Sequence, residues 1–196
     1  PARLFRISFS GELAYEIAVP TRYGNAMMGV LMEAGREFDA VPYGTEALGV
    51  MRIEKGHAAG NELNGQTTAL NLGLDGLINK KKDCIGKVLS QRPEMSDPDG
   101  LRLVGFGPVD TSQPLQAGAH FIDTGAEATM DNDQGWMTSV AYSPTLGHHI
   151  GLGFIRRGKD RMGDVVRATN PVRGNEVKVK IVSPHFVDPE GERLRA

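Results

Sequence analysis

The sequence predicts an α+β fold in two successive parts. Apolar residues recur at helical spacing over residues 22–34 and 46–55, and strand-like alternation precedes the first of these stretches. From Leu101 onward the pattern changes to short apolar alternations broken by Gly, Pro and Asp. Such a pattern is typical of a small antiparallel β-barrel or sandwich. Residues 94–100 hold turn formers and no apolar period, so we expect a linker there.

The beginning of the chain predicts a strand, a turn and a second strand. Apolar and polar residues alternate over residues 6–9 and again over 15–19. Gly11 lies in the turn between them, where it can adopt a positive φ. Glu16 takes the face opposite its neighbours, so its carboxylate is either exposed to solvent or used to bind a ligand. The residues alone favour solvent, because buried acids need partners.

Two helices are expected before residue 60. We expect Thr21 and Gly35 to bound the helix at 22–34, and Thr45 and Gly56 to bound the helix at 46–55. Glu54 lies at the negative end of the second helix dipole, which does not favour a carboxylate. It therefore has a specific partner or forms a surface ion pair, and the residues alone favour the ion pair.

Residues 60–100 are expected to be largely irregular. A polar loop occupies 60–68, and alternating leucines over 70–77 suggest a strand or a bend. Lys80, Lys81 and Lys82 form either a solvated face or a contact with an anionic group of a ligand or partner subunit. A short helix is expected to begin within residues 85–89 and to end before Pro93.

The second part predicts about six strands and a charged tail. We expect the strands at 101–106, 119–122, 136–142, 150–155, 164–168 and 176–182. The tail from Phe186 to Ala196 is expected to fray.

Composition and charge exclude several classes of function. The chain has 196 residues, a formal net charge of −2 and 40% hydrophobic residues. A net charge near zero provides no bulk attraction to nucleic acid or to an anionic membrane. The only cysteine, Cys84, cannot form an internal disulfide, and no apolar run is long enough to span a bilayer. We therefore expect a cytoplasmic protein without nucleic-acid or membrane partners, and its start at Pro1 suggests a fragment or processed product.

Several familiar chemistries are missing from the sequence. It contains no Gly-x-Gly-x-x-Gly or phosphate-loop motif, so this segment is not expected to bind a dinucleotide. The five histidines lack ligand spacing, and zinc binding is not expected with one cysteine. Cys84 follows the lysine run, which could lower its thiol pKa, but without a nearby base we expect it to be inert.

Four stretches together resemble the aminomethyltransferase (glycine-cleavage T-protein) family. Residues 8–17 resemble its Tyr-Thr-Gly-Glu turn followed by Glu-Ile, and residues 52–56 its Arg-Leu-Glu-Ala-Gly helix end. Residues 60–68 resemble its Gly-Asn-Asp/Glu loop, and residues 135–146 its Thr-Ser…Ser-Pro-Thr/Ser-Leu signature. Each is weak alone, but their order and spacing across nearly the whole chain are specific. Arg-Ile-Glu-Lys-Gly-His and the lysine run are similar to the later part of heterotetrameric sarcosine oxidase alpha subunits.

The resemblance implies a fold and a site. Residues 1–96 would be the second half of a folate-binding domain, and 101–190 its C-terminal barrel. Tetrahydrofolate would be the cofactor, with Glu16, Tyr15, Arg52 and Glu54 as candidate cofactor-binding residues: Tyr15 and Glu16 follow the turn, and Arg52 and Glu54 lie in the helix end. Glu16 matches the acid that hydrogen-bonds the pterin ring, and a carboxylate can accept two adjacent N–H donors.

The resemblance also shows departures and leaves alternatives open. The family's folate-site arginine falls on Leu48 here and a barrel arginine near Leu115, while its catalytic aspartate would precede Pro1. The implied role is to hold the folate that captures the one-carbon unit of oxidised sarcosine as methylenetetrahydrofolate, with flavin and NAD in other segments or partner sarcosine oxidase subunits. The alternatives are a stand-alone aminomethyltransferase, a dimethylglycine dehydrogenase-like folate domain, and a non-catalytic assembly module of a multi-subunit oxidase.

Overall fold

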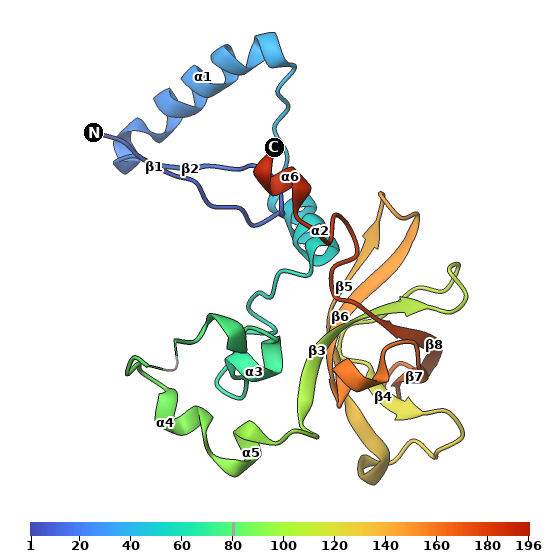
Figure 1. Ribbon diagram of the computed structural model, residues 1–196. Helices are drawn as coiled ribbons and strands as arrows, with labels where there is room; N and C mark the ends of the chain where they lie inside the picture. Colours follow the sequence, from blue (N-terminus) through green and yellow to red (C-terminus); the bar gives the residue numbers. More distant parts are fainter. Residues whose placement is uncertain (80) are drawn as a thin grey trace.

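The structure is a computed structural model that describes residues 1–79 and 81–196. In Figure 1 a β-hairpin and a long helix extend away from a barrel, and short helices lie beside the barrel. The prediction for Lys80 lies outside the described residues. Its neighbours Lys81 and Lys82 are exposed.

The N-terminal strands form a two-stranded antiparallel sheet. β1 (Arg3–Phe5) pairs with β2 (Glu16–Ala18), so Arg3 lies opposite Ala18 and Phe5 opposite Glu16. The prediction of a first strand at 6–9 was therefore wrong. Residues 6–13 instead run along the C-terminal segment, where the Leu13 amide donates to the Arg193 carbonyl. Gly11 has the predicted positive φ, at 84°.

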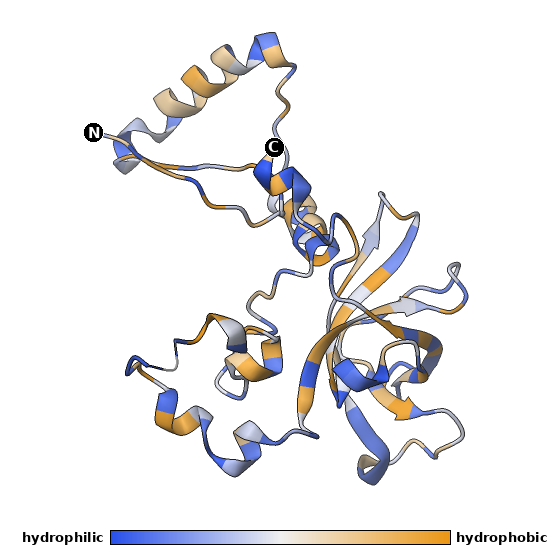
Figure 2. Ribbon diagram, in the orientation of Figure 1, coloured by the Kyte–Doolittle hydropathy of each residue, from blue (hydrophilic) through white to orange (hydrophobic). Residues whose placement is uncertain are grey.

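The two predicted helices are present with different N-termini. α1 (Gly24–Gly35) follows a 3₁₀ turn at Thr21–Tyr23 and continues into a second one at Arg36–Phe38. α2 (Thr45–Lys55) has Gly44 at its N-cap position, so Thr45 is not the cap. Gly56 ends α2 with a φ of 76°, as predicted. None of the residues of α1 is buried, and apolar residues recur along it and along the hairpin strands (Figure 2).

Three short helices lead to the barrel: α3 (Ala69–Leu72), α4 (Lys87–Ser90) and α5 (Pro93–Ser96). The leucines at 70–77 do not form a strand, because Thr68 and Asn71 build a capping box that starts α3. α5 occupies part of the predicted linker, while residues 97–100 contain neither helix nor strand. The division into units 1–96 and 101–190 stays a prediction.

The second part is a closed antiparallel barrel. Its strands are β3 (Leu101–Pro108), β4 (His120–Asp123), β5 (Asp133–Ser143), β6 (His148–Arg156), β7 (Val165–Asn170) and β8 (Asn175–Val182). They are arranged in the order β3-β6-β5-β4-β7-β8, and β8 pairs with β3 to close the ring. The six predicted strands are thus confirmed, and closure decides between barrel and sandwich.

Two apolar clusters hold this part together. The barrel interior contains Phe106 and Phe121, whose rings stack with centroids 4.0 Å apart. A second cluster lies on the outside of β3 and β6 and includes Ile53 of α2. This second cluster packs α2 against the barrel wall.

The C-terminal segment is ordered against α2, so the prediction of a frayed tail was wrong. The amides of Phe186 and Val187 both donate to the Glu54 carbonyl, at 2.9 and 3.0 Å. A last short helix, α6 (Glu192–Arg195), follows. These backbone bonds tie the end of the chain to the end of α2.

Candidate functional site

Glu16 and Tyr15 lie in the exposed hairpin. Glu16 is the first residue of β2, and Tyr15 directly precedes that strand. The end of the hairpin reaches α1, because residues 1–2 and 19–20 line a cavity of about 310 Å³ together with residues of that helix.

Phe5 is the cross-strand neighbour of Glu16. The two residues are directly opposite in the antiparallel register, so their side chains leave the same face with Cβ atoms about 5 Å apart. Both side chains are exposed. Within residues 1–79 and 81–196, Glu16 makes no side-chain hydrogen bond or ion pair. The hairpin thus presents an uncommitted carboxylate beside an aromatic ring.

Arg52 is buried between α2 and the barrel, with 8% of its surface exposed. Its Nη1 lies 3.0 Å from the Glu62 carboxylate, and its Nη2 donates to Ser139 Oγ of β5 at 2.6 Å. Nη1 also donates to the His57 carbonyl at 3.3 Å. The guanidinium is thus bound to the polar loop and to β5 at once.

Glu62 is the centre of this cluster and is 0% exposed. One carboxylate oxygen accepts from the Ala59 amide (2.9 Å) and Arg52; the other lies 2.5 Å from Thr138 Oγ1 and 2.6 Å from Ser139 Oγ. Desolvation by burial raises the pKa of the Glu62 carboxyl, but the bonds from Ser139, Thr138 and Ala59 and the charge of Arg52 outweigh it. The net pKa lies below its ordinary value, so the buried group is ionised.

Glu54 is also buried, at 7% exposure, which contradicts the expectation of a surface ion pair. Its carboxylate accepts a hydrogen bond of 2.5 Å from Ser143 Oγ at the end of β5. Ser143 is fully buried and also accepts from the Leu146 amide at 3.0 Å. The alternative that the residues favoured less, a specific partner, is the one observed, and this partner is a barrel hydroxyl.

The end of α2 also contacts the segment that leads into β2. A Cβ on Gly11 would lie 2.4 Å from the Lys55 side chain, so the two are in close contact. The rings of Phe9 and His57 meet edge-on at 4.8 Å. Desolvation by burial, followed by the nearby Arg52 charge, lowers the pKa of the His57 imidazole.

The four predicted site residues therefore form two separate pairs. Tyr15 and Glu16 are exposed in the hairpin, and Arg52 and Glu54 are buried against β5. Among the described residues, no side-chain hydrogen bond or ion pair joins one pair to the other. The assignment of all four to one ligand stays a prediction.

Sequence reasoning did not identify Glu62 as the partner of Arg52, nor the three hydroxyl groups of β5 that bond to Arg52, Glu54 and Glu62. Glu62, Thr138, Ser139 and Ser143 all lie within the quoted motifs, but nothing in a single sequence pairs residues that are 76 or more positions apart. The sequence signal that could have pointed to these residues was the presence of hydroxyl and acidic side chains in those motifs. The departure at Leu115 has a packing explanation, because this side chain is 5% exposed in the barrel core.

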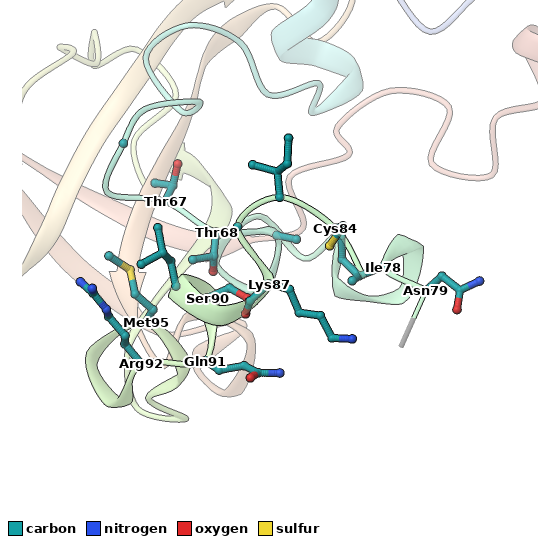
Figure 3. Close-up of a pocket in the computed structure, with 15 residues that line it drawn as sticks. Thr67, Thr68, Ile78, Asn79, Cys84, Lys87, Ser90, Gln91, Arg92 and Met95 are labelled. Atoms are coloured by element: carbon teal, nitrogen blue, oxygen red, sulfur yellow. The ribbon is translucent and has the colours of Figure 1, made fainter. Parts of the chain in front are cut away.

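A cavity of about 690 Å³ lies away from all four predicted residues. It is lined by Gly65 and residues 67–69, by Ile78 and Asn79, and by residues 84–87, 89–92 and Met95 (Figure 3). Cys84 and Lys87 both line it, and Cys84 is exposed. In the described part of the chain, no group of three or more His, Cys, Asp or Glu residues could hold a metal ion, and no helix could cross a membrane.

Two family models match successive parts of the chain. The glycine cleavage T-protein N-terminal domain matches residues 1–82, and the glycine cleavage T-protein C-terminal barrel domain matches residues 102–188. The second match coincides with the closed barrel. Both agree with the order of the four motifs.

Known proteins resemble the chain over most of its length. It is 44% identical to the sarcosine oxidase subunit alpha of Rhizobium meliloti over 97% of this chain and 20% of that protein. It is 34% identical to the aminomethyltransferase of Thermosynechococcus vestitus over 79% of this chain and 40% of that protein. The chain thus spans about a fifth of the first relative and less than half of the second.

A solved structure has the same fold. The crystal structure of glycine cleavage system aminomethyltransferase T from Bartonella henselae superposes with a TM-score of 0.80, covering 96% of this chain and 50% of that chain, at 24% identity. The two family models describe successive domains of one family and together match most of the chain, so the chain belongs to the glycine cleavage T-protein (aminomethyltransferase) family.

Proposed function

We propose that the chain is part of the tetrahydrofolate-binding half of a sarcosine oxidase alpha subunit. The observation that carries the proposal is the 44% identity to such a subunit across 97% of this chain. Its partners would be the other sarcosine oxidase subunits, which would supply the flavin and oxidise the amine. The single cysteine is compatible with work in the reducing cytoplasm.

The exposed face of the hairpin fits a pterin. An aminopyrimidinone edge offers adjacent N–H donors, and a carboxylate such as that of Glu16 accepts both in a charge-assisted pair. Phe5, directly opposite, can cover one side of a flat ring. Tyr15 directly precedes β2 and its side chain is exposed, so its proposed contact with the cofactor would come from the start of this strand.

Arg52 and Glu54 fit a positioning role better than direct contact with the cofactor. Both side chains are nearly fully buried and bound to hydroxyl groups of β5. Removing either from its partner to reach a ligand would leave a buried polar group without a hydrogen bond. We therefore propose that they orient α2, which in turn supports the segment before Glu16.

The residues of this site would hold tetrahydrofolate, whose nitrogens would supply the nucleophiles that take up the one-carbon unit of oxidised sarcosine as methylenetetrahydrofolate, with glycine as the leaving group. The residues described here would contribute orientation and exclusion of water. By the family resemblance, Leu48 and a position near Leu115 stand where the family carries arginines, and Leu115 itself packs in the barrel core. This composition supports capture of a released one-carbon unit over the complete aminomethyltransferase reaction, which remains the alternative for a stand-alone or dimethylglycine dehydrogenase-like protein.

A non-catalytic assembly role is the second candidate. Many large apolar side chains of the hairpin and α1 are exposed, among them Leu4, Ile17, Val30 and Leu31. Exposed apolar surfaces of this kind are typical of interaction sites. In this case the folate site would be vestigial and the chain would serve to join subunits.

Calorimetric titration of tetrahydrofolate into the full-length alpha subunit tests the proposal. We expect Glu16→Gln to weaken binding by about tenfold or more, because the charge-assisted pair is lost. Glu37→Gln, at an exposed position after α1, is the matched control and should bind as the wild type does. No binding by the wild-type subunit would overturn the folate function and favour the assembly role, whereas equal binding by Glu16→Gln would overturn only the assignment of Glu16.

A further inference from the structure

Glu62 is a buried ionised group that takes no part in the proposed contacts with folate. Its carboxylate is 0% exposed and accepts from four groups, so it cannot touch a ligand without losing bonds. A buried charge of this kind is costly unless it is fully paired. Its four donors belong to three parts of the chain, which indicates that it fixes how these parts are arranged.

On one side Glu62 holds the barrel wall. Thr138 Oγ1 and Ser139 Oγ both lie within 2.6 Å of the same carboxylate oxygen. They occupy the part of β5 where the pairing with β6 shifts register between Met137 and Ser139. A register shift lets consecutive residues of one strand reach the same partner, so this irregularity presents two hydroxyls to one carboxylate.

On the other side Glu62 holds the end of α2. Arg52 is bound to Glu62 and Ser139 together, and three residues later Lys55 packs against Gly11. His57, whose amide donates to the Arg52 carbonyl at 2.8 Å, meets the Phe9 ring. A continuous set of contacts thus joins β5 to the segment that enters β2.

We propose that Glu62 is the positioning residue that fixes Glu16 relative to the barrel. It does so by pinning α2 to β5, and α2 supports residues 9–11, five to seven positions before Glu16. The identity of the ligand that Glu16 binds rests on the function proposed above. The structural coupling between Glu62 and Glu16 does not depend on that function. The two can be tested separately.

Hydrogen exchange of the full-length subunit tests the coupling without a ligand. Glu62→Gln keeps the shape of the side chain and removes its charge, which leaves Arg52 without its counter-ion. We expect amides of residues 9–18 and 138–139 to exchange at least about fivefold faster, while those of β7 and β8 are unchanged. Glu46→Gln, at an exposed position of the first turn of α2, is the matched control and should leave all three regions as in the wild type.

Tetrahydrofolate affinity of the same variants gives the functional readout. We expect Glu62→Gln to raise the Kd by about fivefold at a temperature where its circular dichroism equals that of the wild type. Faster exchange spread evenly over the chain, or unchanged exchange at 9–18, would overturn the proposal and leave Glu62 a purely stabilising group. A wild-type subunit that binds no folate would overturn the proposed function, while the exchange result would still decide the coupling.

Discussion

Ser143→Ala should destabilise the protein strongly although it removes a single oxygen atom. Ser143 is 0% exposed, and its hydroxyl donates to the buried Glu54 carboxylate at 2.5 Å and accepts from the Leu146 amide at 3.0 Å. A hydrogen bond to a charged group contributes about 1.5–3 kcal/mol and a neutral one about 0.5–1.5 kcal/mol. Because the alanine leaves a buried carboxylate without this donor, we expect the free energy of unfolding to fall by about 2–4 kcal/mol.

Urea unfolding followed by tryptophan fluorescence measures this loss. Trp136 is the single tryptophan of the chain, lies in β5 and packs against Phe154 with ring centroids 5.9 Å apart, so its emission reports on the barrel. Ser112→Ala is the matched control, because Ser112 also donates to a carboxylate, that of Asp110, at an exposed site; we expect no measurable change there. A loss below about 1 kcal/mol for Ser143→Ala would refute the view that this bond fixes α2 on the barrel.

Two further predictions concern pH and backbone geometry. The lowered pKa of His57 means that the unfolded chain takes up its proton first, so stability should begin to fall below pH 6.5; the lowered pKa of Glu62 adds a second loss below pH 4.5. The free energy of unfolding, measured at several pH values in this range, should no longer show the loss below pH 4.5 in the Glu62→Gln variant. The same pH dependence in the variant and the wild type would contradict the assignment of that loss to Glu62. Gly135→Ala should disrupt the pairing of β5 with β6, because its φ is 140° and a Cβ would lie 2.0 Å from the Phe154 carbonyl oxygen. Gly107→Ala, with open space around its Cβ, should by comparison fold normally, and equal melting temperatures for the two variants would contradict this reading.

Local signals were sufficient for much of the fold. The positive φ of Gly11 and the end of α2 at Gly56 followed from turn and helix-end chemistry, which acts within a few residues. The six barrel strands followed from alternation, which marks a surface with one buried face. These features depend on interactions between sequence neighbours, and they could be predicted for that reason.

Other features depended on contacts between segments far apart in the chain, which cannot be predicted from a single sequence. The strand expected at residues 6–9 was displaced to Arg3–Phe5, because residues 6–13 bind the C-terminal segment instead. The tail expected to fray is held by the Glu54 carbonyl for the same reason. In both cases a long-range partner provided hydrogen bonds that outweighed local preference.

The candidate site divides in the same way. The sequence by itself determined that Glu16 stands in a strand with its neighbours on the opposite face, because side chains alternate with a period of two. It also identified Arg52 and Glu54 as candidates, through motif resemblance and the helix dipole. Only the tertiary structure decided that these two are buried against β5, where Glu62 and Ser139 bind Arg52 and Ser143 binds Glu54. The physical reason is that a buried charge is defined by its partners, and here the partners come from segments that only folding brings together.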